Sequence, residues 1–316
     1  MRKYKGQYGF IGILLCFASC IAVGQQVSAQ AQHPPAGQAD SSMSPVPNRL
    51  EAAELELRRD LELQPNSPAL LYRLGVVLRQ EKKPRQSLEI FQRAARLERP
   101  DAEQLLSVAL DYVLLNDYND AIHWLEIAES FDPRNIEVEY SLGRCLYSQD
   151  RFPEAAAKFL RVLELKPDHL KAEENLGLAY DIMNEPAKAE EALRKAATWA
   201  GQESTDEWPF LDSGTFLLDH DRAAEAVPLL QRAAAIAPNR AACHERLGRA
   251  LILMNDIDDG VKELEIATRL EPTNAKTHYE LAMIYREAGD LDKARTESGL
   301  SQSLLEHDQT RRPSGC

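Results

Sequence analysis

Residues 136–169 read IEVEYSLGRCLYSQDRFPEAAAKFLRVLELKPDH, and this stretch decides the fold. Apolar residues recur every three or four positions in two runs, from Ile136 to Tyr147 and from Phe152 to Leu165, with a short polar segment between them. This spacing predicts two amphipathic helices joined by a turn. Pro167 follows the second run and ends that helix, because proline has no N–H to donate. The stretch therefore predicts one helical hairpin.

The same hairpin recurs along the chain at a fixed spacing. Pro133 and Pro167 are 34 residues apart, as are Pro238 and Pro272, and Pro65 precedes Pro133 by twice that interval. A fixed period of this length indicates a repeat architecture in which neighbouring units stack to bury a continuous core.

The repeated residues resemble the tetratricopeptide repeat (TPR) in alternating large and small side chains at fixed positions. Position seven is apolar in all units but one: Leu74, Val108, Leu142, Leu176, Ser213, Leu247 and Leu281. Position eight is always small: Gly75, Ala109, Gly143, Gly177, Gly214, Gly248 and Ala282. Small residues permit two helices to cross at close range. The resemblance implies an all-α, right-handed superhelical solenoid of helix-turn-helix TPR units.

This pattern assigns most of the chain to the solenoid and leaves two short terminal segments. A Pro- and Ser-rich segment, residues 30–47, is predicted to be a disordered linker, and residues 307–316 a disordered tail. About three extra residues between Gln202 and Asp206 predict a kink or a flexible joint. The predicted solenoid, residues 48–306, comprises a half repeat at 48–66 and repeats at about 68–101, 102–135, 136–169, 170–203, 207–240, 241–274 and 275–306.

The first 29 residues have the organisation of a secretory signal peptide. Basic residues at positions 2, 3 and 5 precede an apolar run from Phe10 to Val23, and small residues at 27–29 offer a cleavage site. The apolar run is 14 residues long, which is short of the roughly 20 residues that cross a bilayer as a helix. We therefore expect an exported protein, periplasmic or extracellular, without a membrane span in the mature chain.

A second interpretation of the N-terminus is lipidation at Cys20. Phe17-Ala18-Ser19-Cys20 resembles a bacterial lipobox, in which the cysteine is lipidated and becomes the new N-terminus. The family pattern prefers Leu where this chain has Phe17, and the apolar run continues beyond Cys20. Cleavage after Ala29 is therefore the preferred prediction, and an outer-membrane lipoprotein is the alternative.

The charge balance argues against nucleic acid as the partner. The formal net charge is −13, and an acidic surface repels phosphate backbones. Most acidic side chains are expected on solvated helix faces.

Side chains capable of catalysis or metal binding do not form a recognisable motif. His244 and His278 both occupy position four of a repeat, and their spacing offers no third metal ligand, so we expect them to pack within their hairpins. Cys145 and Cys243 lie three repeats apart, too far for a disulfide, and are predicted to be free and partly buried. The sequence thus predicts no enzyme activity, no metal site and no cofactor.

In the TPR family, the first helix of each hairpin lines a concave groove at positions two, five, nine and twelve. The resemblance therefore implies a protein or peptide ligand bound in this groove. The matching partner-binding candidates are Tyr72, Val76, Leu106, Leu110, Val113, Tyr140, Arg144, Tyr147, Leu178 and Asp181. The alternative interpretation, of equal weight, is that Leu106, Leu110 and Val113 only pack between adjacent hairpins. The residues with which some relatives hold a peptide's terminal carboxylate are absent, since Leu106 and Leu110 occupy the Lys and Asn positions.

Together these features predict an exported, non-catalytic TPR scaffold for protein–protein interaction. The alternatives are a self-associating structural envelope protein, forming homo-oligomers, and a lipid-anchored assembly factor.

Overall fold

The computed structural model describes residues 49–201 and 204–311, which form fifteen α-helices and no strand. The predicted signal peptide, the lipidation candidate Cys20 and the linker lie outside the described residues, as do Gln202, Glu203 and residues 312–316. The chain divides into two compact units between Phe131 and Asp132.

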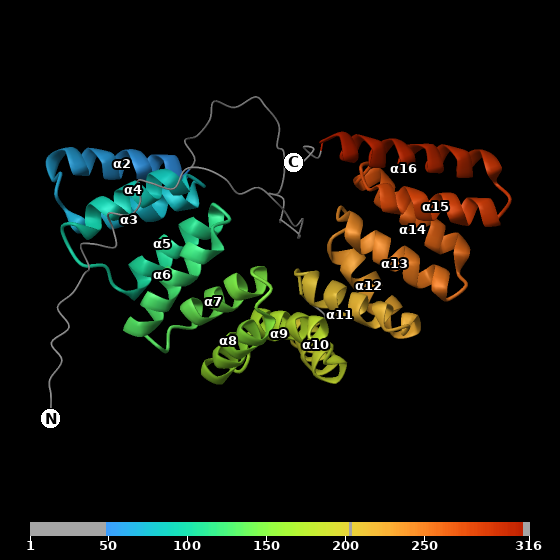
Figure 1. Cartoon of the computed structure of the whole chain (residues 1–316), viewed down its shortest axis with the longest axis horizontal. Helices are drawn as coiled ribbons and strands as arrows, with labels where there is room; N and C mark the ends of the chain where they lie inside the picture. The colour runs from blue at the N-terminus through green and yellow to red at the C-terminus, as the bar shows by residue number, and fades with distance from the viewer. Residues whose placement is uncertain (1–48, 202–203, 312–316) are drawn as a thin grey trace. The chain divides into compact units, whose positions relative to one another are not determined.

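The first unit contains two helical hairpins and one preceding helix (Figure 1). The preceding helix packs on α3 and buries Leu57 and Leu61, as expected for an extra second helix that covers the end of the array. The helices of the first unit are α2 (Arg49–Leu63), α3 (Pro68–Gln80), α4 (Pro84–Ala95), α5 (Ala102–Leu114) and α6 (Tyr118–Phe131).

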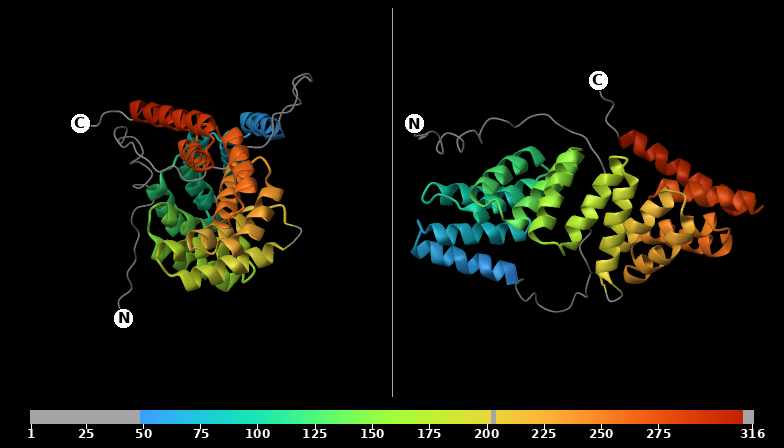
Figure 2. Two further views of the ribbon diagram at one scale, coloured as in Figure 1. Left: turned by 90° about the vertical axis from the view of Figure 1, so that its right-hand side faces the viewer. Right: turned by 90° about the horizontal axis from the view of Figure 1, so that it is seen from below.

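The second unit contains five hairpins, and the two helices of each lie side by side (Figures 1 and 2). The last helix extends past residue 306, where the sequence predicts the end of the repeat, because neither proline nor glycine interrupts residues 300–311. The helices of the second unit are α7 (Ile136–Ser148), α8 (Phe152–Leu165), α9 (Leu170–Ile182), α10 (Pro186–Ala200), α11 (Trp208–Asp219), α12 (Ala223–Ile236), α13 (Ala241–Leu253), α14 (Ile257–Leu270), α15 (Ala275–Glu287) and α16 (Leu291–Arg311).

Each hairpin turns on one residue with positive φ. These residues all occupy position fifteen, two residues after the end of the first helix, and Asn and Asp predominate: Lys82, Asn116, Asp150, Asn184, Asp221, Asn255 and Gly289. Asn, Asp and Gly tolerate the left-handed conformation better than other residues, and one such residue ends a helix and reverses the chain. The turn is therefore encoded locally in every unit.

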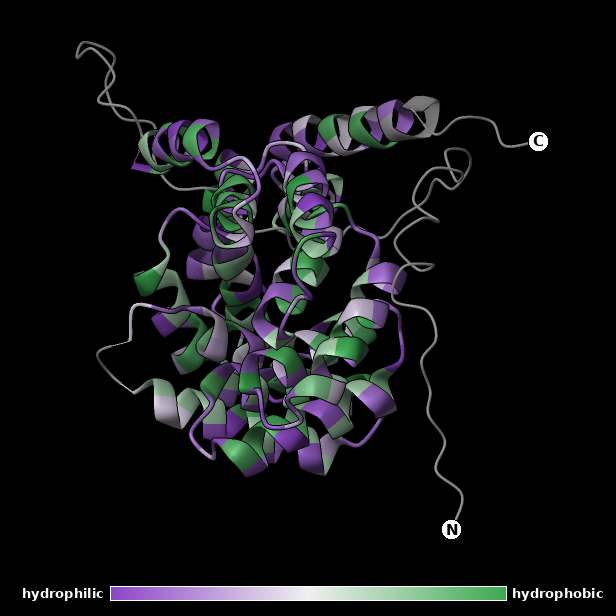
Figure 3. Ribbon diagram, turned by 90° about the vertical axis from the view of Figure 1, so that its left-hand side faces the viewer, coloured by the Kyte–Doolittle hydropathy of each residue, from purple (hydrophilic) through white to green (hydrophobic). Residues whose placement is uncertain are grey.

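The small residue at position eight allows the two helices of a hairpin to meet. At Gly143, an added Cβ would lie 2.6 Å from the ring of Phe159, which is fully buried at position twenty-four. A Cβ at Gly177 would lie 2.7 Å from Leu193 in the same way. Hydrophobic and hydrophilic residues are interspersed along the helices (Figure 3).

Two polar residues at core positions are satisfied by hydrogen bonds. The hydroxyl of Ser213, the polar exception at position seven, lies 2.9 Å from the Leu193 carbonyl and 2.7 Å from the Pro209 carbonyl, either of which can accept its one hydrogen. In the first unit, the Ser87 hydroxyl lies 2.8 Å from the Gly75 carbonyl and 2.5 Å from Asp111 Oδ2.

Burial of Asp111 determines which group donates the hydrogen bond between Ser87 and Asp111. The Asp111 side chain is fully buried, and this burial raises its pKa to about 7. Because a hydroxyl has a single hydrogen, Ser87 donates to the Gly75 carbonyl when protonated Asp111 donates to Ser87.

Candidate functional site

The first helices of successive hairpins are neighbours, so their exposed residues form a common surface within each unit. In the first unit α3 contacts α5, and in the second unit α7, α9, α11 and α13 contact one another in sequence. The ten predicted partner-binding residues all belong to these first helices.

In the first unit, the predicted residues are largely covered by the protein itself. Tyr72 is 7% exposed and donates a hydrogen bond of 2.8 Å to the Glu98 carbonyl, and Leu106 is 8% exposed. Val76, Leu110 and Val113 are half-buried. The predicted residues of the first unit therefore offer few free polar groups.

In the second unit, the predicted residues retain accessible aromatic and charged groups. Tyr140 is half-buried, with its ring centroid 5.1 Å from that of His169, and the exposed Arg144 guanidinium lies 5.9 Å from the Tyr140 ring. Tyr147 is half-buried, and its ring meets that of Phe152 edge-on at 5.2 Å. The remaining two residues, Leu178 and Asp181 of α9, are also half-buried.

Between α9 and α11 lies a pair of carboxyl groups that sequence reasoning missed. Glu174 is only 8% exposed, and its carboxyl hydrogen-bonds to Asp212. Burial, followed by the hydrogen bond and charge of Asp212, raises the pKa of Glu174 to about 9. Burial also raises the pKa of Asp212, to about 6. At neutral pH this arrangement keeps a proton on Glu174 and a charge on Asp212.

The carboxyl pair is electrostatically linked to the predicted tyrosines. Burial raises the pKa of Tyr147 to about 12, with Asp212 and Asp181 as the next causes. The pKa of Tyr140 is raised by burial, and Glu174 contributes in the same direction. We name these six residues the tyrosine–carboxylate surface: Tyr140, Arg144, Tyr147, Glu174, Asp181 and Asp212.

The repeat register contains a signal for the missed residues. Glu174 occupies position five of its repeat, one of the groove positions of the family, and Tyr140 occupies the same position one repeat earlier. Asp212 stands at position six of the next repeat. Its approach to Glu174 depends on the packing of α11 against α9, which no local pattern specifies.

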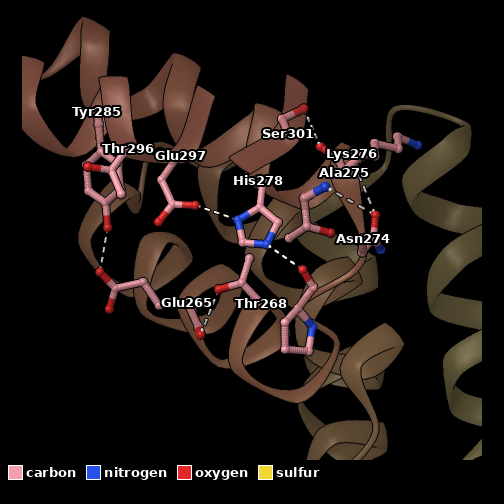
Figure 4. Close-up of polar contacts among 12 residues, drawn as sticks. Glu265, Thr268, Asn274, Ala275, Lys276, His278, Tyr285, Thr296, Glu297 and Ser301 are labelled. Carbon is pink, nitrogen blue, oxygen red and sulfur yellow. Dashed lines mark hydrogen bonds and ion pairs between the residues drawn. The ribbon is translucent and has the colours of Figure 1, made fainter. Parts of the chain in front are cut away.

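The two candidate histidines pack inside their hairpins, as expected. His278 Nδ1 lies 2.6 Å from Glu297 Oε2, and its Nε2 lies 3.1 Å from the Pro272 carbonyl (Figure 4). His244 repeats the geometry with Glu263 at 2.6 Å. Each ring thus lies within hydrogen-bond distance of one carboxyl group and one backbone carbonyl.

These histidine pairs are variants of a contact between positions four and twenty-three of one hairpin, which we call the hairpin rung. In the unit of α7 and α8, Glu139 and Lys158 form this rung at 3.2 Å. In the first hairpin the same positions hold Leu71 and Ile90. The rung therefore joins two helices with either apolar or charged partners.

Within residues 49–201 and 204–311, no group of three or more His, Cys, Asp or Glu is placed to hold a metal ion. Cys145 and Cys243 are free and buried, and burial raises the pKa of each thiol to about 12, which suppresses the reactive thiolate. None of the described helices is both long and apolar enough to span a membrane.

Family models described as tetratricopeptide repeat match residues 108–169, 140–204, 217–269 and 264–296. The chain belongs to the tetratricopeptide-repeat family. The matched segments cover hairpins in both units, in agreement with the observed helix order.

Individual TPR proteins align with only part of the chain. A Caenorhabditis elegans protein, tetratricopeptide repeat-containing protein trd-1, is 28% identical over 150 residues, which are 47% of this chain and 18% of that protein. Type IV pilus assembly protein PilF of Pseudomonas aeruginosa is 27% identical over 148 residues, 46% of this chain and 45% of PilF. This chain thus spans less than half the length of these relatives.

Solved TPR structures agree with the fold. The structure of Pseudomonas aeruginosa PilF superposes with a TM-score of 0.58 at 20% identity, covering 75% of this chain and 98% of that chain. The structure titled PilW, a type IV pilus biogenesis factor, gives a TM-score of 0.59 at 19% identity, covering 65% and 94%. At these identities the likeness concerns the fold alone.

Proposed function

We propose that this TPR protein is an exported scaffold without catalytic activity, and that its tyrosine–carboxylate surface binds a segment of a partner protein. The observation that carries the proposal is the placement of Tyr140, Arg144 and Tyr147 on one first helix, α7, with the Arg144 guanidinium 5.9 Å from the Tyr140 ring. Tyr and Arg are favoured in binding hot spots, because they combine large contact area with directional polar groups.

Several features of the second unit support binding rather than chemistry. Its buried thiols are inert, and the carboxyl pair lies in the wall of a helical surface, with Glu174 only 8% exposed. Tyr147 and Asp181 are half-buried near that pair and keep exposed surface that a ligand can contact, with Asp181 Oδ1 3.8 Å from His220 Nε2. Stacked repeats commonly use such an extended surface for recognition.

We place the protein in the periplasm or outside the cell, and in the assembly of an envelope structure. The signal-peptide pattern of residues 1–29 supports export, and the sequence similarity to a type IV pilus assembly protein supports a role in assembly. Lipid attachment at Cys20 is the alternative form of the same proposal.

The binding surface is tested by capturing envelope proteins on the wild type and on two folded variants. Arg144→Glu combined with Tyr147→Ala changes the surface, whereas Arg194→Glu reverses an exposed charge on the second helix α10. A partner kept by wild type and by Arg194→Glu, but lost by the double variant, supports the proposal. Equal retention by all three would place recognition elsewhere.

Export is tested by the intact mass of the protein recovered separately from the cell envelope and from the cytoplasm. A product that starts at Gln30 supports cleavage by the ordinary signal peptidase. A product that starts at Cys20 and carries added acyl mass supports the lipoprotein form. A product that retains Met1 in the cytoplasm contradicts export.

Self-association is the competing structural role, and it has one supporting observation. Large apolar residues are exposed on the terminal helices of the array, with Leu63 of α2 at 83% and Leu305 of α16 at 54%. Sedimentation across a range of concentrations separates the roles, since a monomer at every concentration contradicts self-association.

A further inference from the structure

The first unit contains an apolar cavity of about 230 Å³ that lies apart from the tyrosine–carboxylate surface. Aromatic and aliphatic side chains from all four hairpin helices line it: Tyr72, Leu88, Phe91, Leu105, Val108 and Trp124. An apolar cavity of about 150 Å³ holds one benzene ring, so this space is large enough for a fused bicyclic ring.

The early end of α4 explains why the cavity exists. This helix has 12 residues, whereas α6 and α8 have 14. In the first repeat Pro100 also stands one residue later than the usual terminal proline, with Arg99 in the usual place. Ala95, the last residue of α4, and Pro100, in the loop after it, both line the cavity. The space therefore lies where α4 is two residues, about half a turn, shorter than these other second helices.

Hydrogen bonds and core packing fix the walls of the cavity. The Tyr72 hydroxyl donates to the Glu98 carbonyl at 2.8 Å and so fixes the loop after α4. That loop ends in a capping box. The Asp101 carboxylate accepts from the Gln104 N–H at 2.8 Å, and the Gln104 side-chain oxygen accepts from the Asp101 N–H at 3.0 Å. Phe91 is only 2% exposed, so this part of the wall is fixed by core packing.

The lining selects the chemistry of a ligand. The rings of Tyr72 and Phe91 have centroids 6.1 Å apart, and Trp124 adds a third ring to the wall, which favours an aromatic guest through edge and offset contacts. Glu89 and Gln92 also line the cavity and bring carboxyl and amide oxygens that accept hydrogen bonds, whereas the Tyr72 hydroxyl already donates to the Glu98 carbonyl.

We propose that this cavity binds one aromatic ring system that carries an N–H or O–H donor, such as an indole. The donor bonds to the Glu89 or Gln92 end of the cavity, and the ring contacts the three aromatic side chains. The ring belongs either to a free small molecule or to a tryptophan side chain of a bound protein. This site is independent of the proposed scaffold function, because its ligand binds without any partner of the second unit.

The test is calorimetric titration of indole into the full-length protein and three variants. Ala95→Leu and Val108→Phe fill the cavity, and each is expected to weaken indole binding by about tenfold or more. Ala102→Leu is the matched control, because Ala102 is a half-buried residue of the same unit that does not line the cavity, and it should bind like wild type. Circular dichroism verifies that each variant is folded.

Two further ligands test the donor and identify the source of the ring. Indene has the shape of indole without the N–H, and equal affinity for both would overturn the donor requirement. A short peptide with one central tryptophan that binds more tightly than indole supports a side chain as the ligand, and weaker binding of the peptide supports a free molecule. Absence of indole binding to wild type, or unchanged binding to both folded filling variants, would overturn the site.

Discussion

Replacing Gly143 with alanine should destabilise the second unit, although alanine is the better helix former. The new Cβ would lie 2.6 and 2.8 Å from two ring carbons of Phe159, whereas carbon atoms pack optimally at about 3.5–4.0 Å. The ring has no exposed surface and cannot rotate out into solvent. The two helices of the hairpin must therefore separate, or the ring must leave its preferred rotamer.

The magnitude follows from two opposing effects. Overpacking of a tight core costs up to about 3 kcal/mol, and exchange of glycine for alanine within a helix returns about 1 kcal/mol. We expect a net destabilisation of about 2 kcal/mol for Gly143→Ala. Gly299 is the matched control, because an added Cβ on this residue of α16 meets nothing within 4 Å, and Gly299→Ala should stabilise by up to about 1 kcal/mol.

Urea denaturation followed by circular dichroism measures both variants, and a second substitution tests the cause. In the second repeat the same two positions hold Ala109 and Leu125, so Phe159→Leu should accommodate alanine at position 143. The double variant should be more stable than the sum of the single effects predicts. If Gly143→Ala were as stable as wild type, or if the two substitutions were additive, close packing at position eight would not be the constraint.

Three further predictions concern buried polar groups. Because the pKa of Glu174 is raised to about 9 in the folded chain, the folded protein keeps a proton that the unfolded protein loses above about pH 5. The wild type should therefore lose stability relative to Glu174→Gln as the pH rises from about 5 to about 8, as measured by urea denaturation at each pH. His278→Ala leaves Glu297 unpaired and should lower the free energy of unfolding by about 1–3 kcal/mol. The double variant His278→Leu with Glu297→Ile should recover much of that loss, as measured by hydrogen exchange in α15 and α16. Ser87→Ala removes the partner of buried Asp111 and should cost about 1–3 kcal/mol in thermal or urea unfolding.

Each of these predictions has an outcome that contradicts it. A pH-independent difference between wild type and Glu174→Gln would mean that the carboxyl titrates normally. Failure of the apolar pair to recover stability at the His278 rung would mean that this hairpin requires its hydrogen-bonded pair. Unchanged stability of Ser87→Ala would mean that Asp111 finds another partner.

Local pattern was sufficient to predict the hairpins of this protein. Helical periodicity, the 34-residue interval and the alternation of large and small residues specify each unit, because each signal acts within one hairpin. The turn residues at position fifteen, such as Asn116 and Asp150, were available to the same reasoning, since their side chains tolerate positive φ. The same register placed His244 and His278 within their hairpins.

Tertiary structure decided the features that depend on contacts between hairpins. The pairing of Glu174 with Asp212 requires α11 to lie against α9, and the pKa values of both groups follow from the burial that this contact produces. The burial of Tyr72, predicted as a groove residue, depends on the loop after α4, which accepts its hydroxyl at Glu98. The cavity beside it arises because α4 ends early. A repeat pattern describes the average unit, whereas these features come from the places where neighbouring units differ.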